Sequence, residues 1–156
     1  MSSSEPQRIL FVCVENACRS QIAQAFARQR GGAAIEAYSA GAKPRGSVDA
    51  MAIDVMRERG IDMSRHTSKG FDALPNITWD VLVTMGCGEA CPHLPAIRRV
   101  DWQIPDPARQ PVEVYRQIRD LIDGAVQLLL TTIPPTGLRA SSEPPSAQSG
   151  GGVAYG

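Results

Sequence analysis

The apolar and polar positions of the chain follow two periods, one typical of buried strands and the other typical of helices. A continuous apolar run, ILFVCV at residues 9–14, predicts a strand that is buried on both faces of a parallel sheet. After a short turn, apolar side chains recur at helical spacing at Ile22, Ala25 and Phe26, and the glycine pair at 31–32 predicts the end of this helix. The chain therefore begins with a strand, a turn and a helix.

The alternation continues with a second strand, which is predicted from Ile35 to Ala40 and is ended by Gly41. Ser47 is a suitable N-cap for the helix that follows, and Gly60 lies just beyond the expected end of that helix. The apolar face of this second helix is formed by Val48, Met51, Ala52 and Val55.

The remaining regular elements are two strands and one long helix. The run DVLVTM at 80–85 predicts a third strand, and IRRVDWQI at 97–104 predicts a short fourth one. Strands that alternate with helices favour an α/β fold, and we expect a three-layer sandwich with a four-stranded parallel sheet flanked by helices. The apolar positions that outline the last helix are Val114, Ile118, Leu121, Ile122, Ala125 and Leu129.

The length and composition of the chain limit the number of domains. Its 156 residues suffice for one domain, which we expect to span residues 8–133 after a flexible N-terminus at 1–7. From 134 to 156, more than half of the residues are Pro, Gly or Ser and the periodicity is lost. A disordered tail is therefore predicted there.

Charge and hydropathy exclude several classes of partner. Sixteen basic and sixteen acidic residues cancel, so no general attraction to nucleic acids or anionic membranes is expected. The first residues lack the pattern of a secretory signal, and the apolar runs are too short to cross a bilayer. We therefore expect a cytoplasmic protein, and we expect it to be a monomer. Cysteines of cytoplasmic proteins, of which this chain has four, are more often reactive or metal-binding than joined in disulfides.

The turn after the first strand carries the strongest chemical signal in the sequence. Cys13 and Arg19 have the spacing C-x5-R, and Ser20 follows directly. Backbone N–H groups of such a loop, together with a helix N-terminus, form a concave set of donors for a tetrahedral anion, which a guanidinium group can close. The same positive field favours the thiolate of Cys13, which is the nucleophilic form. The expected oxyanion-binding residues are Val14, Glu15, Asn16, Ala17, Cys18, Arg19 and Ser20.

Two residues of this loop are expected to support the nucleophile. Asn16 suits a position with an unusual backbone conformation, and its amide can brace the loop. Ser20 can donate a hydrogen bond to the Cys13 thiolate. The loop alone is compatible with hydrolysis and with redox chemistry. The alternative is that the loop has no function, with Cys13 as a buried strand residue and Arg19 as a surface charge.

The stretch VCVENACRSQIAQAF resembles the phosphate-binding loop of the low-molecular-weight protein tyrosine phosphatase family. Its CRSQ ending is more similar to the arsenate reductase branch than to the phosphatases, in which proline usually follows the serine. The similarity continues through YSAG (38–41), GIDMSRHTSKGF (60–71) and DWQIPDP (101–107), and covers about residues 8–133. The resemblance implies the fold of that family and a cysteine-based reaction on an oxyanion.

A second pair of cysteines, Cys87 and Cys91, follows the third predicted strand. Loops at the carboxyl ends of parallel strands meet at one edge of the sheet, so this pair should approach Cys13. The residues alone leave two other interpretations open: both cysteines are small buried side chains in a loop, or they bind zinc together with His93. The resemblance implies a thiol relay: Cys87 resolves an arsenate adduct on Cys13, and Cys91 then takes over the disulfide for reduction by thioredoxin or another small thiol protein.

The resemblance also implies a general acid. Asp106, in IPDP, matches the aspartate that protonates the leaving oxygen in the family, and Pro105 and Pro107 restrict the backbone around it. A turn-forming aspartate between prolines is the alternative. The aromatic residues that grip a phenyl ring in tyrosine phosphatases are missing after this motif, where Ala108 and Arg109 stand. A small inorganic oxyanion therefore fits better than phosphotyrosine.

Four further polar positions are assigned no catalytic role. Gln24 replaces an acidic residue that some members of the family use in a potassium site, so no tight potassium ion is expected. Cys18 is expected to pack in the loop, and under oxidation it can protect Cys13 through a local disulfide. His66 and His93 are each solitary and are interpreted as hydrogen-bonding residues of loops.

Three hypotheses for the function follow. The first is an arsenate reductase that uses Cys13, Arg19, Asp106 and the relay of Cys87 and Cys91, with an external dithiol as reductant and no bound cofactor or metal. The second is a phosphatase that hydrolyses phosphomonoesters, including phosphotyrosine, with the same nucleophile, clamp and acid. The third is a module that binds oxyanions or senses redox state without turnover. Because nucleophile, clamp and acid occur together, catalysis is favoured over binding alone.

Overall fold

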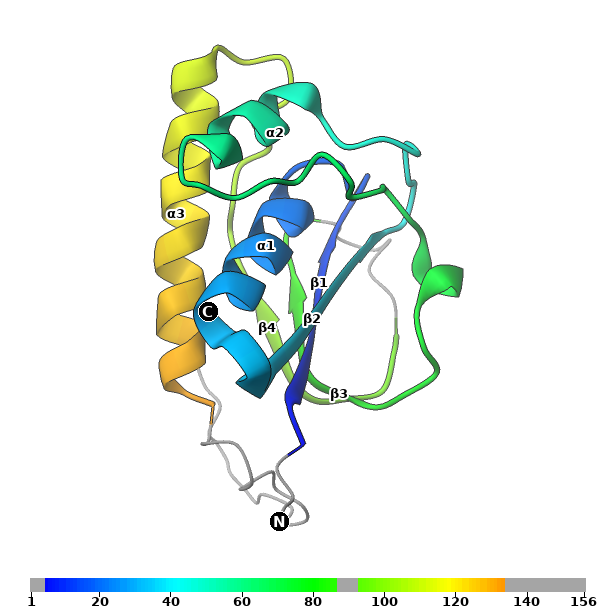
Figure 1. Cartoon of the computed structure of the whole chain (residues 1–156). Helices are drawn as coiled ribbons and strands as arrows, with labels where there is room; N and C mark the ends of the chain where they lie inside the picture. Colours follow the sequence, from blue (N-terminus) through cyan, green and yellow to red (C-terminus); the bar gives the residue numbers. More distant parts are fainter. Residues whose placement is uncertain (1–4, 87–92, 134–156) are drawn as a thin grey trace.

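The computed structural model describes residues 5–86 and 93–133 (Figure 1). Each predicted strand and α-helix is present, and no helix in these two ranges is long and apolar enough to cross a membrane. The elements in chain order are β1 (Gln7–Cys13), α1 (Arg19–Gly31), the 3₁₀ helix η1 (Gly32–Ala34), β2 (Ile35–Gly41), α2 (Ala50–Arg57), the 3₁₀ helix η2 (Phe71–Ala73), β3 (Trp79–Thr84), β4 (Ala96–Asp101) and α3 (Val112–Thr131).

The strands form one parallel sheet in the order β2-β1-β3-β4. The central strand β1 pairs with β2 from Gln7, opposite Ile35, to Cys13, opposite Gly41. Residues 9–12 are fully buried, which explains the continuous apolar run. Gln7 was expected to be part of a flexible N-terminus, but it is a buried, paired position of the sheet. The carboxyl ends of β1 and β2 lie side by side, at Cys13 and Gly41.

The two faces of the sheet are covered differently. On one face, Ile9, Phe11 and Val83 belong to a large core to which α1, α2 and α3 all contribute (Figure 1). On the opposite face, Leu10 and Leu82 belong to a smaller cluster with residues of η2 and its neighbours. The predicted fold class holds, but within the described ranges the three α-helices share one face. The segment before β3 contains glycine and proline, so it covers the other face with a 3₁₀ turn and extended chain.

The N-terminus of α2 differs from the prediction. Its N-cap is Asp49 and not Ser47, because the Asp49 carboxylate accepts a hydrogen bond from the Met51 N–H at 3.0 Å, whereas Ser47 lies exposed before the helix. The Tyr115 hydroxyl donates to the same carboxylate at 2.5 Å, and the Asp49 N–H donates to the Ala17 carbonyl at 2.9 Å. These contacts attach α2 to α3 and to the loop after β1.

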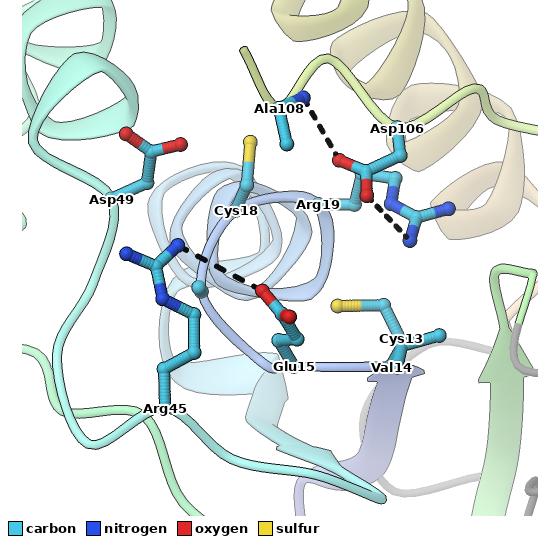
Figure 2. Close-up of a pocket in the computed structure, with 10 residues that line it drawn as sticks. Cys13, Val14, Glu15, Cys18, Arg19, Arg45, Asp49, Asp106 and Ala108 are labelled. Carbon is cyan, nitrogen blue, oxygen red and sulfur yellow. Dashed lines mark hydrogen bonds and ion pairs between the residues drawn. The ribbon is translucent and has the colours of Figure 1, made fainter.

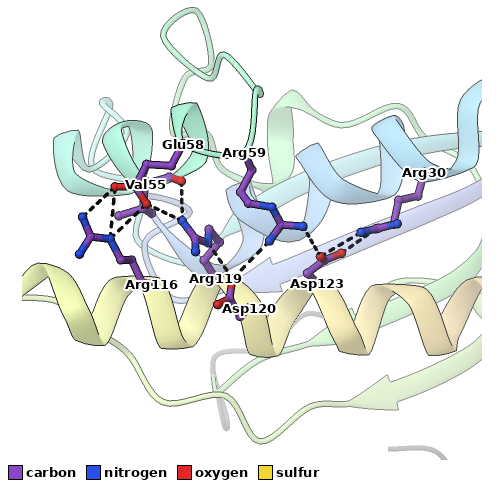
Figure 3. Close-up of polar contacts among 8 residues, drawn as sticks. All are labelled: Arg30, Val55, Glu58, Arg59, Arg116, Arg119, Asp120 and Asp123. Carbon is purple, nitrogen blue, oxygen red and sulfur yellow. Dashed lines mark hydrogen bonds and ion pairs between the residues drawn. The ribbon is translucent and has the colours of Figure 1, made fainter.

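A chain of ion pairs connects α3 with α1 and with the segment after α2 (Figure 3). The Asp123 carboxylate accepts hydrogen bonds from Arg30 at 2.6 Å and from Arg59 at 2.8 Å, and its side chain is only 6% exposed. Further along α3, Arg119 pairs with Glu58 at 2.8 Å. We infer that these pairs fix the three helices relative to one another.

Replacing Asp123 by Asn is expected to lower the free energy of unfolding by about 2 kcal/mol at pH 7. Burial alone would raise the pKa of Asp123, but the hydrogen bonds from Arg30 and Arg59 outweigh it and lower this pKa from 3.8 to about 2. Because the pKa is lower in the folded state, the stabilisation is present above about pH 4 and is lost as the pH falls towards 2. Urea unfolding of the native protein and the variant across this range measures the difference.

Asp120→Asn is the matched control for this prediction. Asp120 also lies on α3 and pairs with Arg59 and Arg119, but its side chain is 58% exposed. The loss of stability should therefore stay below about 1 kcal/mol. If both variants lost the same free energy of unfolding, the burial of Asp123 would not strengthen its ion pairs.

Candidate active site

The loop between β1 and α1, residues 14–18, forms one wall of an open pocket at the carboxyl edge of the sheet (Figure 2). Cys13 ends β1, Arg19 begins α1, and Asp106 faces the same pocket. Of the predicted oxyanion-binding residues, Asn16 and Ser20 are not among those that line the pocket, and both are buried. The described lining residues are Cys13, Val14, Glu15, Ala17, Cys18, Arg19, Arg45, Asp49, Asp106 and Ala108.

Asn16 determines the shape of the loop. Its φ angle of 53° lies in the left-handed region, which asparagine adopts more readily than most residues. The buried amide donates to the Ser20 hydroxyl at 2.8 Å, and its Oδ1 accepts from Gln21 Nε2 and from the Lys69 N–H, each at 2.9 Å. The prediction for Asn16 is confirmed, because this residue has both the unusual backbone conformation and the bracing amide.

The Cys13 sulfur lies 3.0 Å from the Ser20 hydroxyl oxygen, and both side chains are buried. Because Asn16 donates to that oxygen, the hydroxyl hydrogen of Ser20 is available to the sulfur. A hydroxyl that donates to sulfur stabilises a thiolate, both as a nucleophile and as a leaving group. The predicted contact between Ser20 and Cys13 is therefore present.

Two glycines leave the space that the loop and its arginine require. A Cβ atom on Gly41 would lie 2.7 Å from the Asn16 nitrogen and 2.7 Å from the Val14 oxygen. Gly86 has a φ angle of 80°, and a Cβ atom there would lie 2.9 Å from Arg19 Nη1. Both contacts join residues that are distant in the sequence, so the sequence does not predict these roles. The one sequence signal for them is the final glycine of YSAG, which is Gly41.

Arg19 is fixed between the loop and the segment after β4. Its Nη1 donates to the Ile104 carbonyl at 3.0 Å, and its Nη2 lies 3.8 Å from the Asp106 carboxylate. The Arg19 side chain is 8% exposed, whereas that of Asp106 is 55% exposed and is oriented by the Ala108 N–H at 3.0 Å. The structure thus brings Arg19, the predicted clamp, and Asp106, the predicted acid, to one pocket. Asp106 lies on the open side of this pocket, where a carboxyl group can exchange a proton with an oxygen of a bound anion.

Two charged residues of the pocket mouth, Arg45 and Asp49, are not predicted from the sequence. Arg45 Nη1 lies 3.8 Å from the Glu15 carboxylate, and the Arg45 N–H donates to Ser68 Oγ, which in turn donates to the Glu15 carbonyl at 2.7 Å. Asp49 could have been found as an alternative helix cap. Nothing in the sequence around Arg45 indicates its place, because the loop that carries it is brought to the pocket by contacts that are distant in the sequence.

Gln21 connects the loop to the segment before η2. Its Nε2 donates to the Thr67 carbonyl at 2.8 Å, and its Oε1 lies 3.0 Å from His66 Nδ1. Burial, and then the charges of Arg28 and Lys69, lower the pKa of His66. The imidazole is therefore neutral at pH 7, and its Nδ1–H donates to Gln21. His66, to which the sequence analysis assigned only a hydrogen bond, is an outer support of the loop.

The family of the chain follows from comparison with known proteins. Residues 8–137 match the low molecular weight phosphotyrosine protein phosphatase family. The chain belongs to this family. The predicted resemblance and fold class are thereby confirmed.

Three relatives of the family show how far the similarity extends. A glutaredoxin arsenate reductase of Synechocystis sp. is 35% identical over 130 residues, or 81% of this chain and 98% of that protein. A solved arsenate reductase in the phosphate binding state is 34% identical with a TM-score of 0.74, covering 82% of this chain and 99% of that one. A thioredoxin-dependent arsenate reductase of Corynebacterium glutamicum is 30% identical with a TM-score of 0.68, covering 84% of this chain and 63% of that one.

The cysteines of this family member have different environments. Cys18 is a free, buried thiol at the N-cap of α1, and burial, followed by the Asp49 carboxylate, raises its pKa. Cys18 is therefore protonated at neutral pH, as its predicted packing role requires. Cys87 and Cys91 lie outside the described residues. Gly86, which precedes Cys87 in the sequence, lies against the Arg19 guanidinium group.

Replacing Arg19 by Lys is expected to lower kcat/KM for an oxyanion substrate by about 10²–10³-fold. A lysine ammonium group carries its three N–H donors on one nitrogen, so it lacks the planar fork with which a guanidinium group binds two oxygens of an anion side by side while donating to the Ile104 carbonyl. Steady-state kinetics with arsenate and with an aryl phosphate measure the loss. Arg45→Lys, at the half-exposed mouth of the pocket, is the control, and it should lower kcat/KM less than about tenfold. A larger loss in this variant would mean that Arg45, and not Arg19, is the main clamp of the anion.

Proposed function

We propose that this member of the family is an arsenate reductase. The observation that carries the proposal is the similarity, over about four fifths of the chain, to proteins named arsenate reductase. The pocket supports it, because none of the described residues that line it is aromatic, and Ala108 stands beyond the acid where a phenyl ring would need a wall. A small tetrahedral oxyanion such as arsenate fits these residues better than phosphotyrosine does.

The first step is attack of the Cys13 thiolate on arsenic. An S–As bond forms while an As–O bond breaks, and Asp106 supplies the proton to the leaving oxygen, so that water departs. Arg19 and the N–H groups of the loop hold the remaining oxygens and offset their charge. The Ser20 hydroxyl, 3.0 Å from the sulfur, is placed to donate a hydrogen bond to the nucleophile before attack and to orient it.

The second step reduces the arsenic. The Cys87 thiolate attacks the Cys13 sulfur, an S–S bond forms, and the electron pair of the S–As bond leaves with arsenic as arsenite. Cys91 then attacks Cys87, which transfers the disulfide to Cys87 and Cys91 and frees the Cys13 thiolate. Two thiols lose two electrons in total, and one arsenate gains them.

The third step returns the dithiol through an external carrier. One relative is named for glutaredoxin and another is described as thioredoxin-dependent, so a small dithiol protein of either kind is the proposed partner. The cytoplasm keeps such carriers reduced, and we place this chain there as a monomer without a nucleic acid or membrane partner.

Hydrolysis of phosphomonoesters is the second candidate, because Cys13, Arg19 and Asp106 suffice for it. In that reaction water, and not Cys87, would resolve the intermediate on Cys13. We expect slow turnover of aryl phosphates as a secondary activity of the same pocket.

The test of the proposed function is a coupled assay with arsenate, NADPH, and either thioredoxin with its reductase or glutaredoxin with glutathione and glutathione reductase. Oxidation of NADPH that depends on arsenate, with formation of arsenite, is the expected result. Turnover of aryl phosphate without any arsenite would overturn the proposal in favour of the phosphatase. Binding of arsenate without either product would favour the module that only binds oxyanions.

A further inference from the structure

The ammonium group of Lys69 is bound by three oxygen atoms next to the loop that follows Cys13. Lys69 lies in the segment between α2 and η2, and its side chain is half-buried. Its Nζ donates to the Thr67 carbonyl at 3.2 Å, to Ser39 Oγ at 3.3 Å and to Asn16 Oδ1 at 3.4 Å. An ammonium group has three N–H donors, so each of them has an acceptor. The charge of Lys69 is therefore held in one place beside the loop.

The three acceptors around this ammonium group are all uncharged. Two are side-chain oxygens and one is a backbone carbonyl, so no carboxylate among them neutralises the charge. Burial, followed by the charge of Arg28, lowers the pKa of Lys69, and Lys69 in turn lowers the pKa of His66. A cation that is partly removed from water without a counter-ion is costly, and such groups occur preferentially at functional sites.

Asn16 connects the ammonium group to the nucleophile. Its Oδ1 accepts from Lys69 Nζ, its Nδ2 donates to the Ser20 hydroxyl at 2.8 Å, and that hydroxyl oxygen lies 3.0 Å from the Cys13 sulfur. Because hydrogen bonds in a chain polarise one another, a cation at the oxygen of an amide makes the N–H groups of that amide better donors. The charge of Lys69 therefore reaches the sulfur through three consecutive contacts.

The contacts of Lys69 separate the effect of its charge from the shape of the loop. The backbone N–H of Lys69 donates to Asn16 Oδ1 at 2.9 Å, independently of the side chain. Ser39, on β2, is attached to α1 by its own hydrogen bond to Gln24 Oε1 at 2.5 Å. A substitution of the Lys69 side chain therefore removes the charge and leaves both of these contacts in place.

We propose that the Lys69 ammonium group is a built-in cation that strengthens, through Asn16, the hydrogen bond from Ser20 to the Cys13 sulfur. Lys69 is not among the described residues that line the pocket, so it is a positioning residue. In the arsenate reaction, which rests on the proposed function, the same hydrogen bond assists Cys13 in its attack on arsenic and in its later departure from the disulfide. The effect on the sulfur itself requires no arsenate.

The test is alkylation of Cys13 by iodoacetamide, which needs neither arsenate nor phosphate. The thiolate attacks the methylene carbon, an S–C bond forms and iodide leaves. Lys69→Met removes the charge, and we expect it to lower the second-order rate constant about three- to tenfold at about pH 6.5, less than the loss of a cation in direct contact with the sulfur would. At about pH 10 the rates should converge, because a thiol is then ionised without help. Peptide mass spectrometry assigns the label to Cys13.

Lys69→Ala leaves space for an added amine, and this gives a second measurement. Propylammonium chloride replaces the missing part of the side chain, so it should raise the rate of Lys69→Ala at about pH 6.5 towards the native rate. It should leave Lys69→Met unchanged, because the methionine side chain fills the space. Tetramethylammonium chloride carries the charge without an N–H donor and should restore nothing.

Lys43→Met is the matched control. The chain has two lysines, and the Lys43 backbone N–H also donates to the loop, at 2.8 Å from the Val14 carbonyl, but the Lys43 side chain is exposed. This variant should react at the native rate at both pH values. A native rate for Lys69→Met at about pH 6.5 would overturn the proposal. An equal loss at both pH values would also overturn it, since the substitution would then have changed the loop. Neither outcome depends on whether the protein reduces arsenate.

Discussion

Arsenate turnover falls by at least about 10⁴-fold in Cys13→Ser, while binding of phosphate in the pocket persists. A serine hydroxyl at this position is not ionised at neutral pH, and its described partner, the Ser20 hydroxyl, is no general base. An oxygen at residue 13 also cannot enter a disulfide, so the electrons needed to reduce arsenic have no route. Arsenite formed in a single turnover measures the first effect, and calorimetric titration with phosphate measures the second.

Cys18→Ser provides the comparison for this variant, since it makes the same exchange of sulfur for oxygen five residues later in the sequence. Its loss of turnover should be smaller by at least about two orders of magnitude, because Cys18 is protonated and forms no described bond to the anion site. Similar losses in both variants would contradict the assignment of Cys13 as the nucleophile. Loss of phosphate binding in Cys13→Ser would show that the loop itself had changed.

The sequence predicts the sheet and its helices well because their signals are local. β1 is apolar along its whole length since both of its faces are buried, and α3 shows its apolar stripe since one side packs on the core. The cap of α2 was misplaced because Ser47 and Asp49 are both good caps. The choice depends on the Tyr115 hydroxyl and the Ala17 carbonyl, which are distant in the sequence.

The difference between local signals and contacts that are distant in the sequence also explains which residues of the site could be predicted. Cys13, Asn16, Arg19 and Ser20 were found because one short loop contains them and their spacing has a chemical meaning. Arg45, Asp49 and His66 reach the loop from other segments, through contacts that no short motif encodes. The resemblance to a known family supplied the expected role of Asp106, which the spacing of its neighbours does not show, and the relay expected of Cys87 and Cys91.

Cys87→Ser and Cys91→Ser are expected to stop the proposed relay at different points. Without any external reductant, Cys91→Ser should release one arsenite per chain and retain a disulfide between Cys13 and Cys87. Cys87→Ser should release none, because the adduct on Cys13 has no resolving thiol while Cys18 is protonated. With the reductant system present, both variants should lose steady-state turnover by at least about 10³-fold. Arsenite analysis and disulfide mapping of quenched samples separate the two.

Hydrolysis of an aryl phosphate is the internal control for both variants, because Cys13, Arg19 and Asp106 are unchanged in them. Its rate should stay within about threefold of the native value, since water resolves a phosphate adduct without a second thiol. One equivalent of arsenite from Cys87→Ser would contradict the relay and identify Cys18 or Cys91 as the first resolving thiol. Continued turnover of Cys91→Ser would instead mean that the carrier reaches a disulfide between Cys13 and Cys87 directly, and that the transfer to Cys91 is not required.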